Sequence, residues 1–261
     1  MKQGLSLKTL LSAALLVGSS AALAVQIPSG LSITGTVVLD TVNSFDPEGG
    51  ASQAGSLKQI ISGVTTTSSF TGMPSSISPN TLGGALTHIG DGIGASFSMS
   101  GTYVDTDMFT EGLFADYFLV LENMSLTQTY TVTFSAMISN SVGASGDDAY
   151  AESMIRVSNS VPDEILYSDY RIDTANPGPN NNFTVDSANS SFSVTLLPGE
   201  SASFSALQEQ RGGVFADGSY SASLDAFLRV VSVVPESGSL PMMSLGLLAL
   251  ALTQRHRRRR G

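Results

Sequence analysis

Apolar and polar residues alternate along several stretches of this chain. In TYTVTFSAMIS, residues 129–139, every second residue is apolar: Tyr130, Val132, Phe134, Ala136 and Ile138. The residues between them are mostly Thr and Ser. A period of two places one set of side chains on each face of a strand, so this segment predicts a half-buried β-strand.

The same alternation recurs at intervals along the chain. Four further segments share it, and their expected inward sets are Ile33, Val37 and Leu39; Ala95, Phe97, Met99 and Tyr103; Phe192, Val194 and Leu196; and Ala222, Leu224, Ala226, Leu228 and Val230. AYAESMIRVS shows a weaker version, with Ala151, Ile155 and Val157 inward. The continuous apolar run DYFLVLEN is typical of a central strand.

Gly, Pro, Asn and Asp clusters separate these segments, as in FDPEGG, GASGDD and ANPGPNNN. Short strands between turn signals predict an all-β fold, an antiparallel β-sandwich of jelly-roll or Ig-like type. We expect one body over 25–233, flanked by an N-terminal signal helix and a short hydrophobic C-terminal helix. Within the body, only Ala54–Ile61 is a helix candidate.

The first 24 residues match a secretory signal peptide. Lys2 and Lys8 precede an apolar core, and Ala22 and Ala24 form a small-x-small cleavage site. We therefore expect residues 1–24 to be removed on export. An uncleaved anchor or a buried first helix are the alternatives.

The chain ends on an apolar run, 240–252, followed by a cluster of arginines: Arg255, Arg257, Arg258, Arg259 and Arg260. Thirteen helical residues reach about 20 Å, against a hydrocarbon core of about 30 Å. The run is thus a marginal span that predicts transient anchoring in the inner membrane. The arginines would stay on the cytoplasmic side and stop transfer. The alternative, a nucleic-acid tail, conflicts with export and with an acidic body.

The tail as a whole resembles the PEP-CTERM sorting signal of Gram-negative bacteria. The resemblance is carried by Val234-Pro235-Glu236, the apolar run and the terminal arginines, which together occupy 234–261. Ser237 stands where the family motif has a second proline. Pro235 has a fixed φ and no amide donor, so we expect it to end the preceding strand and present an extended segment.

The resemblance implies a transient partner, an exosortase-like membrane enzyme that would cut near Pro235-Glu236. It also implies a place at the cell surface, in the envelope or outside the cell, and an association with exopolysaccharide or biofilm. Proteins with this tail commonly carry Ser/Thr/Asp-rich β-sandwich bodies.

Without the two ends the chain is strongly acidic. Residues 25–236 contain all 22 acidic residues and five basic ones, a net charge of 5 − 22 = −17. Such a body should repel nucleic acid and anionic membranes, and it could attract cations. The absence of Cys excludes disulfides, thiolate metal sites and Cys nucleophiles.

Two acidic segments are candidate metal sites: Asp105, Asp107 and Glu111 in one, and Asp147 and Asp148 in the other. Calcium prefers several oxygen ligands from a flexible loop, so it is the one candidate cofactor, although the EF-hand spacing is absent. The same acids could serve a glycosidase, which needs two carboxylates about 5–10 Å apart. An acidic surface turn is the simpler interpretation.

Catalysis by a Ser-His-Asp triad would depend on His88, because His256 lies in the basic tail. No Gly-x-Ser-x-Gly elbow is present, so we expect a non-enzymatic protein with no catalytic residue.

Three functions therefore compete. The leading hypothesis is an exported structural or adhesive protein. The second is a secreted carbohydrate-binding or carbohydrate-cleaving module, favoured by a concave face lined by Tyr103, Tyr150, Tyr167 or Tyr170 with converging carboxylates. A flat face covered with Ser and Thr would count against it. The third is a permanently anchored membrane protein.

Overall fold

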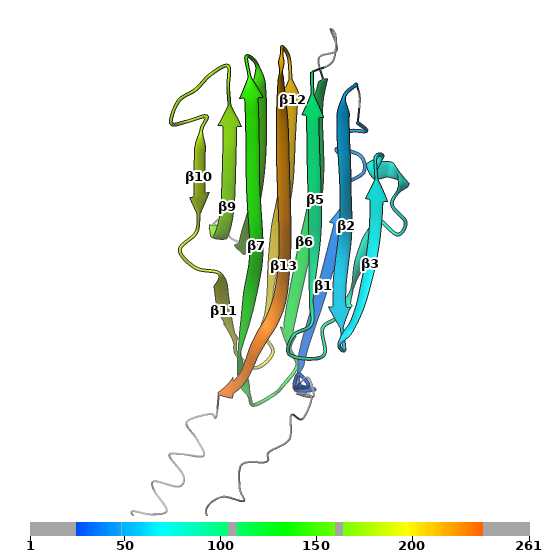
Figure 1. Ribbon diagram of the computed structural model, residues 1–261. Helices are drawn as coiled ribbons and strands as arrows, with labels where there is room; N and C mark the ends of the chain where they lie inside the picture. The colour runs from blue at the N-terminus through cyan, green and yellow to red at the C-terminus, as the bar shows by residue number, and fades with distance from the viewer. Residues whose placement is uncertain (1–24, 48, 104–108, 160–163, 237–261) are drawn as a thin grey trace, which may run out of the picture.

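The computed structural model describes residues 25–47, 49–103, 109–159 and 164–236, which form two antiparallel β-sheets packed face to face (Figure 1). One sheet has the strand order β10-β9-β8-β12-β6-β1-β4. Its strands are β1 (Leu31–Leu39), β4 (Thr81–Ala85), β6 (Phe109–Asn123), β8 (Ala149–Asn159), β9 (Glu164–Asp173), β10 (Phe183–Asp186) and β12 (Ser201–Val214).

The second sheet has the order β11-β7-β13-β5-β2-β3. Its strands are β2 (Ala51–Ile61), β3 (Val64–Thr71), β5 (Gly92–Thr102), β7 (Thr129–Gly146), β11 (Ser191–Leu196) and β13 (Gly218–Glu236). A single turn of 3₁₀-helix, Pro74–Ser76, follows β3. The predicted all-β sandwich is confirmed, whereas both expected terminal helices lie outside the described residues.

The alternating segments bury the sides that the sequence predicted. In β7 and β13 the inward residues line the core, with Phe134 and Val230 fully buried. The inward sets of β1, β5, β8 and β11 join the same core, apart from the partly buried Tyr103 and Val194. β6 lies between β12 and β1, which confirms the central strand. Its outward Phe118 and Val120 remain exposed.

The expected helix over Ala54–Ile61 is wrong, because these residues belong to β2 and pair with both β3 and β5. The inward side of β2 carries Gly55 and Gln59, and the outward side carries Ile60, which hides the alternation. A methyl group at Gly55 would lie 2.6 Å from Phe97 Cδ1 and 2.7 Å from Phe70 Cε1. The inward side is therefore filled by neighbouring aromatic rings.

A polar network crosses the core. Tyr117 Oη on β6 donates to Gln208 Oε1 on β12 at 2.5 Å, and Gln208 Nε2 donates to the carbonyl oxygen of Leu224 on β13 at 3.2 Å. These bonds link the two sheets. Burial raises the pKa of Tyr117 far above its ordinary value, so its hydroxyl stays a donor.

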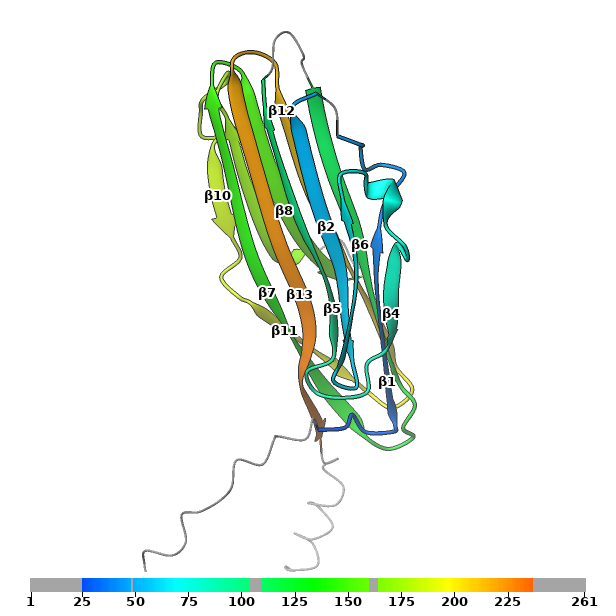
Figure 2. The ribbon, with the colours of Figure 1, turned by 45° about the vertical axis from the view of Figure 1, so that its right-hand side comes forward.

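Most connections pass from one sheet to the other, so the loops gather at the two ends of the long sandwich (Figure 2). One end carries the turns after β7 and β12. At the opposite end lie both Val25, where the described chain begins, and Glu236, where β13 stops (Figures 1 and 2). The described chain therefore begins and ends at the same end of the sandwich.

Candidate functional site

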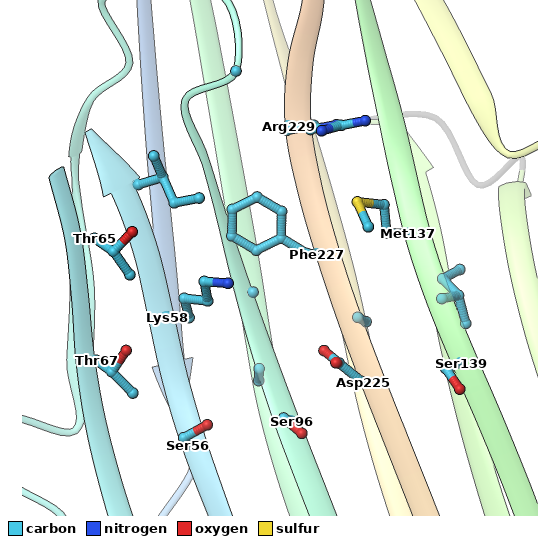
Figure 3. Close-up of a pocket in the computed structure, with 16 residues that line it drawn as sticks. Ser56, Lys58, Thr65, Thr67, Ser96, Met137, Ser139, Asp225, Phe227 and Arg229 are labelled. Atoms are coloured by element: carbon cyan, nitrogen blue, oxygen red, sulfur yellow. The ribbon is translucent and has the colours of Figure 1, made fainter. Parts of the chain in front are cut away.

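A shallow trough of about 720 Å³ lies on the outer face of the six-stranded sheet (Figure 3). Five strands form its floor: β3, β2, β5, β13 and β7. The register places Thr67, Lys58, Gly94, Phe227 and Met137 in one row across these strands. The trough thus runs across the strands rather than along them.

An aromatic ring lies at the centre of the trough. Phe227 is partly exposed, and its ring covers Gly94 on the neighbouring strand, since a methyl group there would lie 2.6 Å from Phe227 Cδ2. Lys58 Nζ lies 5.3 Å from the centre of the same ring, within the range of a cation–π contact. The glycine leaves room for the ring, and the ring and ammonium form a joint apolar and cationic surface.

A second cation, Arg229, lies two residues beyond Phe227 on the same face of β13 (Figure 3). Within the described residues, neither Lys58 nor Arg229 forms an ion pair, whereas Arg156 and Arg211 each pair with carboxylates on the other sheet. One carboxylate, Asp225, also lines the trough. The trough is therefore cationic on a body that is strongly acidic overall.

Hydroxyl groups surround the ring and the charges. The row beside Phe227 contains Ser69, Ser56, Ser96, Asp225 and Ser139. Neighbouring strands lie about 4.8 Å apart, so the hydroxyls form a regular array of donors and acceptors. None of these residues was predicted as a site from the sequence, in which the Ser/Thr-rich outer positions of the strands were the one available signal.

A buried acid lies between the sheets, near the end opposite Val25. Glu111 of β6 is 1% exposed, and one oxygen of its carboxyl accepts a hydrogen bond from the hydroxyl of Tyr220 on β13. Burial raises the pKa of Glu111 to about 7, while the bond from Tyr220 opposes that rise. The other oxygen, Oε1, has no hydrogen-bond partner among the residues that the structure describes.

This environment bears on the expected calcium sites. Glu111 turns inward to Tyr220, and its expected co-ligands Asp105 and Asp107 lie outside the described residues. Asp147 and Asp148 form the turn between β7 and β8, where backbone bonds tie them to Asp217 and Phe215. Among the residues that the structure describes, no three His, Asp or Glu side chains gather as a metal site. Calcium binding stays a prediction.

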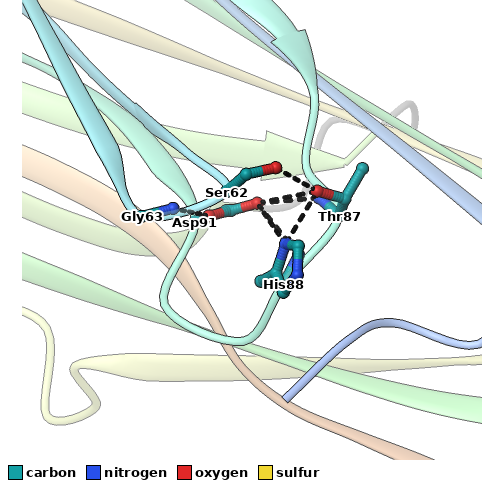
Figure 4. Close-up of polar contacts among 5 residues, drawn as sticks. All are labelled: Ser62, Gly63, Thr87, His88 and Asp91. Atoms are coloured by element: carbon teal, nitrogen blue, oxygen red, sulfur yellow. Dashed lines mark hydrogen bonds and ion pairs between the residues drawn. The ribbon is translucent and has the colours of Figure 1, made fainter. Parts of the chain in front are cut away.

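His88 lies in a loop that Asp91 organises (Figure 4). The fully buried Asp91 accepts bonds from the backbone amides of Thr87 at 2.8 Å, His88 at 2.9 Å and Gly63 at 3.4 Å. The Thr87 hydroxyl contacts both Ser62 Oγ at 2.8 Å and His88 Nδ1 at 2.9 Å, and Asp91 approaches that same nitrogen. A catalytic triad needs the imidazole between its partners, one at each nitrogen. This arrangement instead holds the loop that precedes β5.

The four tyrosines proposed for a sugar site do not gather on one face. Tyr150 stacks on Phe215, with ring centres 6.1 Å apart, and Tyr170 donates to Asp186 at 2.8 Å. Tyr167 and Tyr170 point to opposite faces of β9, because an odd number of steps separates them. Tyr103 packs against the core instead.

The sorting motif begins inside the fold. Val234, Pro235 and Glu236 are exposed at the end of β13, while Ser237, the membrane-helix candidate 240–252, the arginine cluster and the signal site Ala22/Ala24 lie outside the described residues. The expectation that Pro235 ends the strand is wrong, because Pro235 and Glu236 still pair with Tyr130 and Thr129 of β7. A proline can stay in a strand where its missing amide faces no partner.

No helix within the described ranges is long and apolar enough to cross a bilayer. No protein-family model matches the chain, and no curated protein matches it either.

Among solved structures, the chain is similar to three of infectious bursal disease virus. These are the VP2 subviral particle (10% identity, TM-score 0.14, covering 87% of this chain and 72% of that chain), the Gx strain (10%, 0.13, 87% and 73%) and the T13 viral particle (9%, 0.12, 87% and 70%). Similarity at this level carries no argument about function.

Proposed function

We propose that this chain is an exported protein of the cell envelope or extracellular matrix, sorted through its C-terminal tail and structural or adhesive rather than enzymatic. The observation that supports this most is the position of Val25 and Glu236 at one end of the sandwich (Figures 1 and 2). A tether at that end would leave both sheet faces and the far end free to meet other molecules.

The last part of β13 is a suitable processing site. Pairing with β5 stops at Arg229, and the residues after the irregularity between Val230 and Ser232 pair only with β7. The strand bends away from β5 there and stays beside β7 (Figure 1). One bond of its tip is between side chains, from Thr131 Oγ1 to Glu236 Oε1 at 2.9 Å. The tip of β13 is therefore an edge strand, and a strand paired on one side frays more readily than a strand paired on both sides, so an enzyme could engage Pro235-Glu236.

The finer fold assignment belongs to the same proposal. We infer a jelly-roll-like sandwich, because most connections cross between the sheets, with both end segments forming helices in the membrane before processing. The charge of −17 on 25–236 would keep the released body soluble and away from nucleic acid.

The test is the C-terminal residue of the protein in cells with and without an exosortase-like enzyme. We expect a terminus near Glu236 and release from the membrane only when the enzyme is present. Pro235→Ala with Glu236→Gln should block this step, and Glu200→Gln, in an exposed turn at the same end, should not. An intact tail on surface protein in both strains would contradict the proposal. Retention after high-salt washing would then favour a permanent anchor.

A further inference from the structure

We propose that the trough on the six-stranded sheet binds one strand of an anionic polysaccharide. Phe227 would stack against a sugar ring, and Lys58 and Arg229 would bind carboxylate or sulfate groups along the polymer. This proposal deepens the proposed function by naming the polymer class that the exported protein would hold. It rests on the proposed function only for the location outside the cell where protein and polysaccharide would meet.

The charges point to an anionic ligand. Residues 25–236 contain five basic residues against 22 acids. Two of the five, Lys58 and Arg229, line this one trough and form no ion pair with any residue that the structure describes. On a body with this net negative charge, a cationic trough would favour ligands that carry negatively charged groups. Asp225, the acid of the trough, can accept hydrogen bonds from hydroxyl groups.

The ring and the hydroxyls point to a sugar. A pyranose ring presents C–H groups on its faces and hydroxyls around its edge. In the trough, the partly exposed ring of Phe227 lies among the hydroxyls of Ser56, Thr67, Ser96 and Ser139 (Figure 3). An apolar surface with polar groups around it fits such a ring, because the polar groups fix its orientation.

The dimensions point to a polymer rather than to a single sugar. The trough crosses five strands, which at about 4.8 Å between neighbours is about 19 Å from β3 to β7. Its volume of about 720 Å³ falls within the range of ligand sites. Lys58 and Arg229 lie on different strands, in adjacent rows of the register. Two anionic groups on successive units of one chain could therefore reach them together.

Three other kinds of polymer fit the trough less well. Nucleic acid carries one charge per phosphate and needs a broad basic surface, which this acidic body does not offer. An acidic peptide could pair with Lys58 and Arg229, but it has no sugar ring beside its carboxylates to stack on Phe227. A neutral glycan would leave Lys58 and Arg229 without partners.

The experiment measures binding of the purified full-length chain, in detergent, to polygalacturonate, alginate and hyaluronan by calorimetry and affinity electrophoresis. We expect at least one of these polymers to bind, more weakly at high salt. Methyl-esterified polygalacturonate and poly-L-glutamate are the comparison ligands, because the first keeps the sugar without the charge and the second keeps the charge without the sugar.

Two variants test the residues. Lys58→Gln with Arg229→Gln should weaken binding about tenfold or more, because it removes two charged hydrogen bonds. Phe227→Leu keeps the apolar contact with Gly94 and removes the flat ring, so it should weaken binding while the melting temperature stays within a few degrees. The matched control is Arg156→Gln with Arg211→Gln, the same change of charge on the other sheet.

The proposal is overturned if none of the three polymers binds, if the esterified polymer or poly-L-glutamate binds equally well, or if the control pair weakens binding as much as the trough pair. Binding does not depend on tail processing. If the tail is processed but no polymer binds, this proposal has failed; if a polymer binds but the tail is not processed, the proposed function has failed.

Discussion

Replacing Glu111 with glutamine should make the stability of this protein less dependent on pH. The carboxyl of Glu111 is buried between the sheets, and burial raises its pKa from 4.5 to about 7. At 1.36 kcal/mol for each tenfold change in proton affinity, this difference corresponds to about 3 kcal/mol of folding free energy.

The sign follows from comparing the two states. Below about pH 4.5, Glu111 holds its proton in both the folded and the unfolded chain, and its contribution to stability is fully present. Between pH 4.5 and 7 the unfolded chain releases the proton first, so the free energy of unfolding falls as the pH rises through the folded pKa. In the Glu111→Gln variant the new amide would be neutral at every pH, and its oxygen could still accept the bond from Tyr220.

The assay is urea unfolding followed by circular dichroism between pH 4.5 and 9. Wild type and Glu111→Gln should be equally stable at pH 4.5, and the variant should be more stable by up to about 3 kcal/mol above pH 8. Glu122→Gln, an exposed site on the same strand, is the control and should show no such gap. A gap that stays constant with pH, or one shared by the control, would refute the assignment of a buried neutral acid.

Three further substitutions test the packing, each read from thermal unfolding. Tyr117→Phe leaves Gln208 Oε1 in the core without its donor and should cost about 1–3 kcal/mol, part of which Gln208→Leu in the same chain should restore; an unchanged melting temperature for the single variant would show that this bond adds nothing. Gly212→Ala places a methyl group against the ring of Tyr220 and should cost about 1–3 kcal/mol, so a neutral effect would mean that the ring moves freely. Asp91→Ala leaves three backbone amides without their acceptor and should cost about 2 kcal/mol; a stable variant with an unaltered loop before β5 would contradict the role given to Asp91.

The sequence predicted the strands best where alternation is strong and the inward residues are large. β7 and β13 are such cases, because nearly every inward position carries an apolar side chain, Asn140 of β7 being an exception, and most outward positions of β7 carry Ser or Thr. In β2 the two sides differ little in polarity, and local pattern alone indicated a helix. What makes Ala51–Ile61 a strand is its pairing on both edges with β3 and β5, which no local window contains.

Strand pairing also creates the trough, and local sequence patterns do not contain it. This explains why no residue of the trough was predicted as a site residue from the sequence. Lys58 and Phe227 are far apart in the chain, and they meet only because β5 lies between their strands with Gly94 at the matching register position. A one-residue slip of β13 would turn Phe227 into the core and Leu228 outward. That register is set by the inward apolar residues of the same strands. The core pattern that the sequence did reveal therefore determines which outward residues share a row, and a search of that face has to begin from strand pairing rather than from motifs.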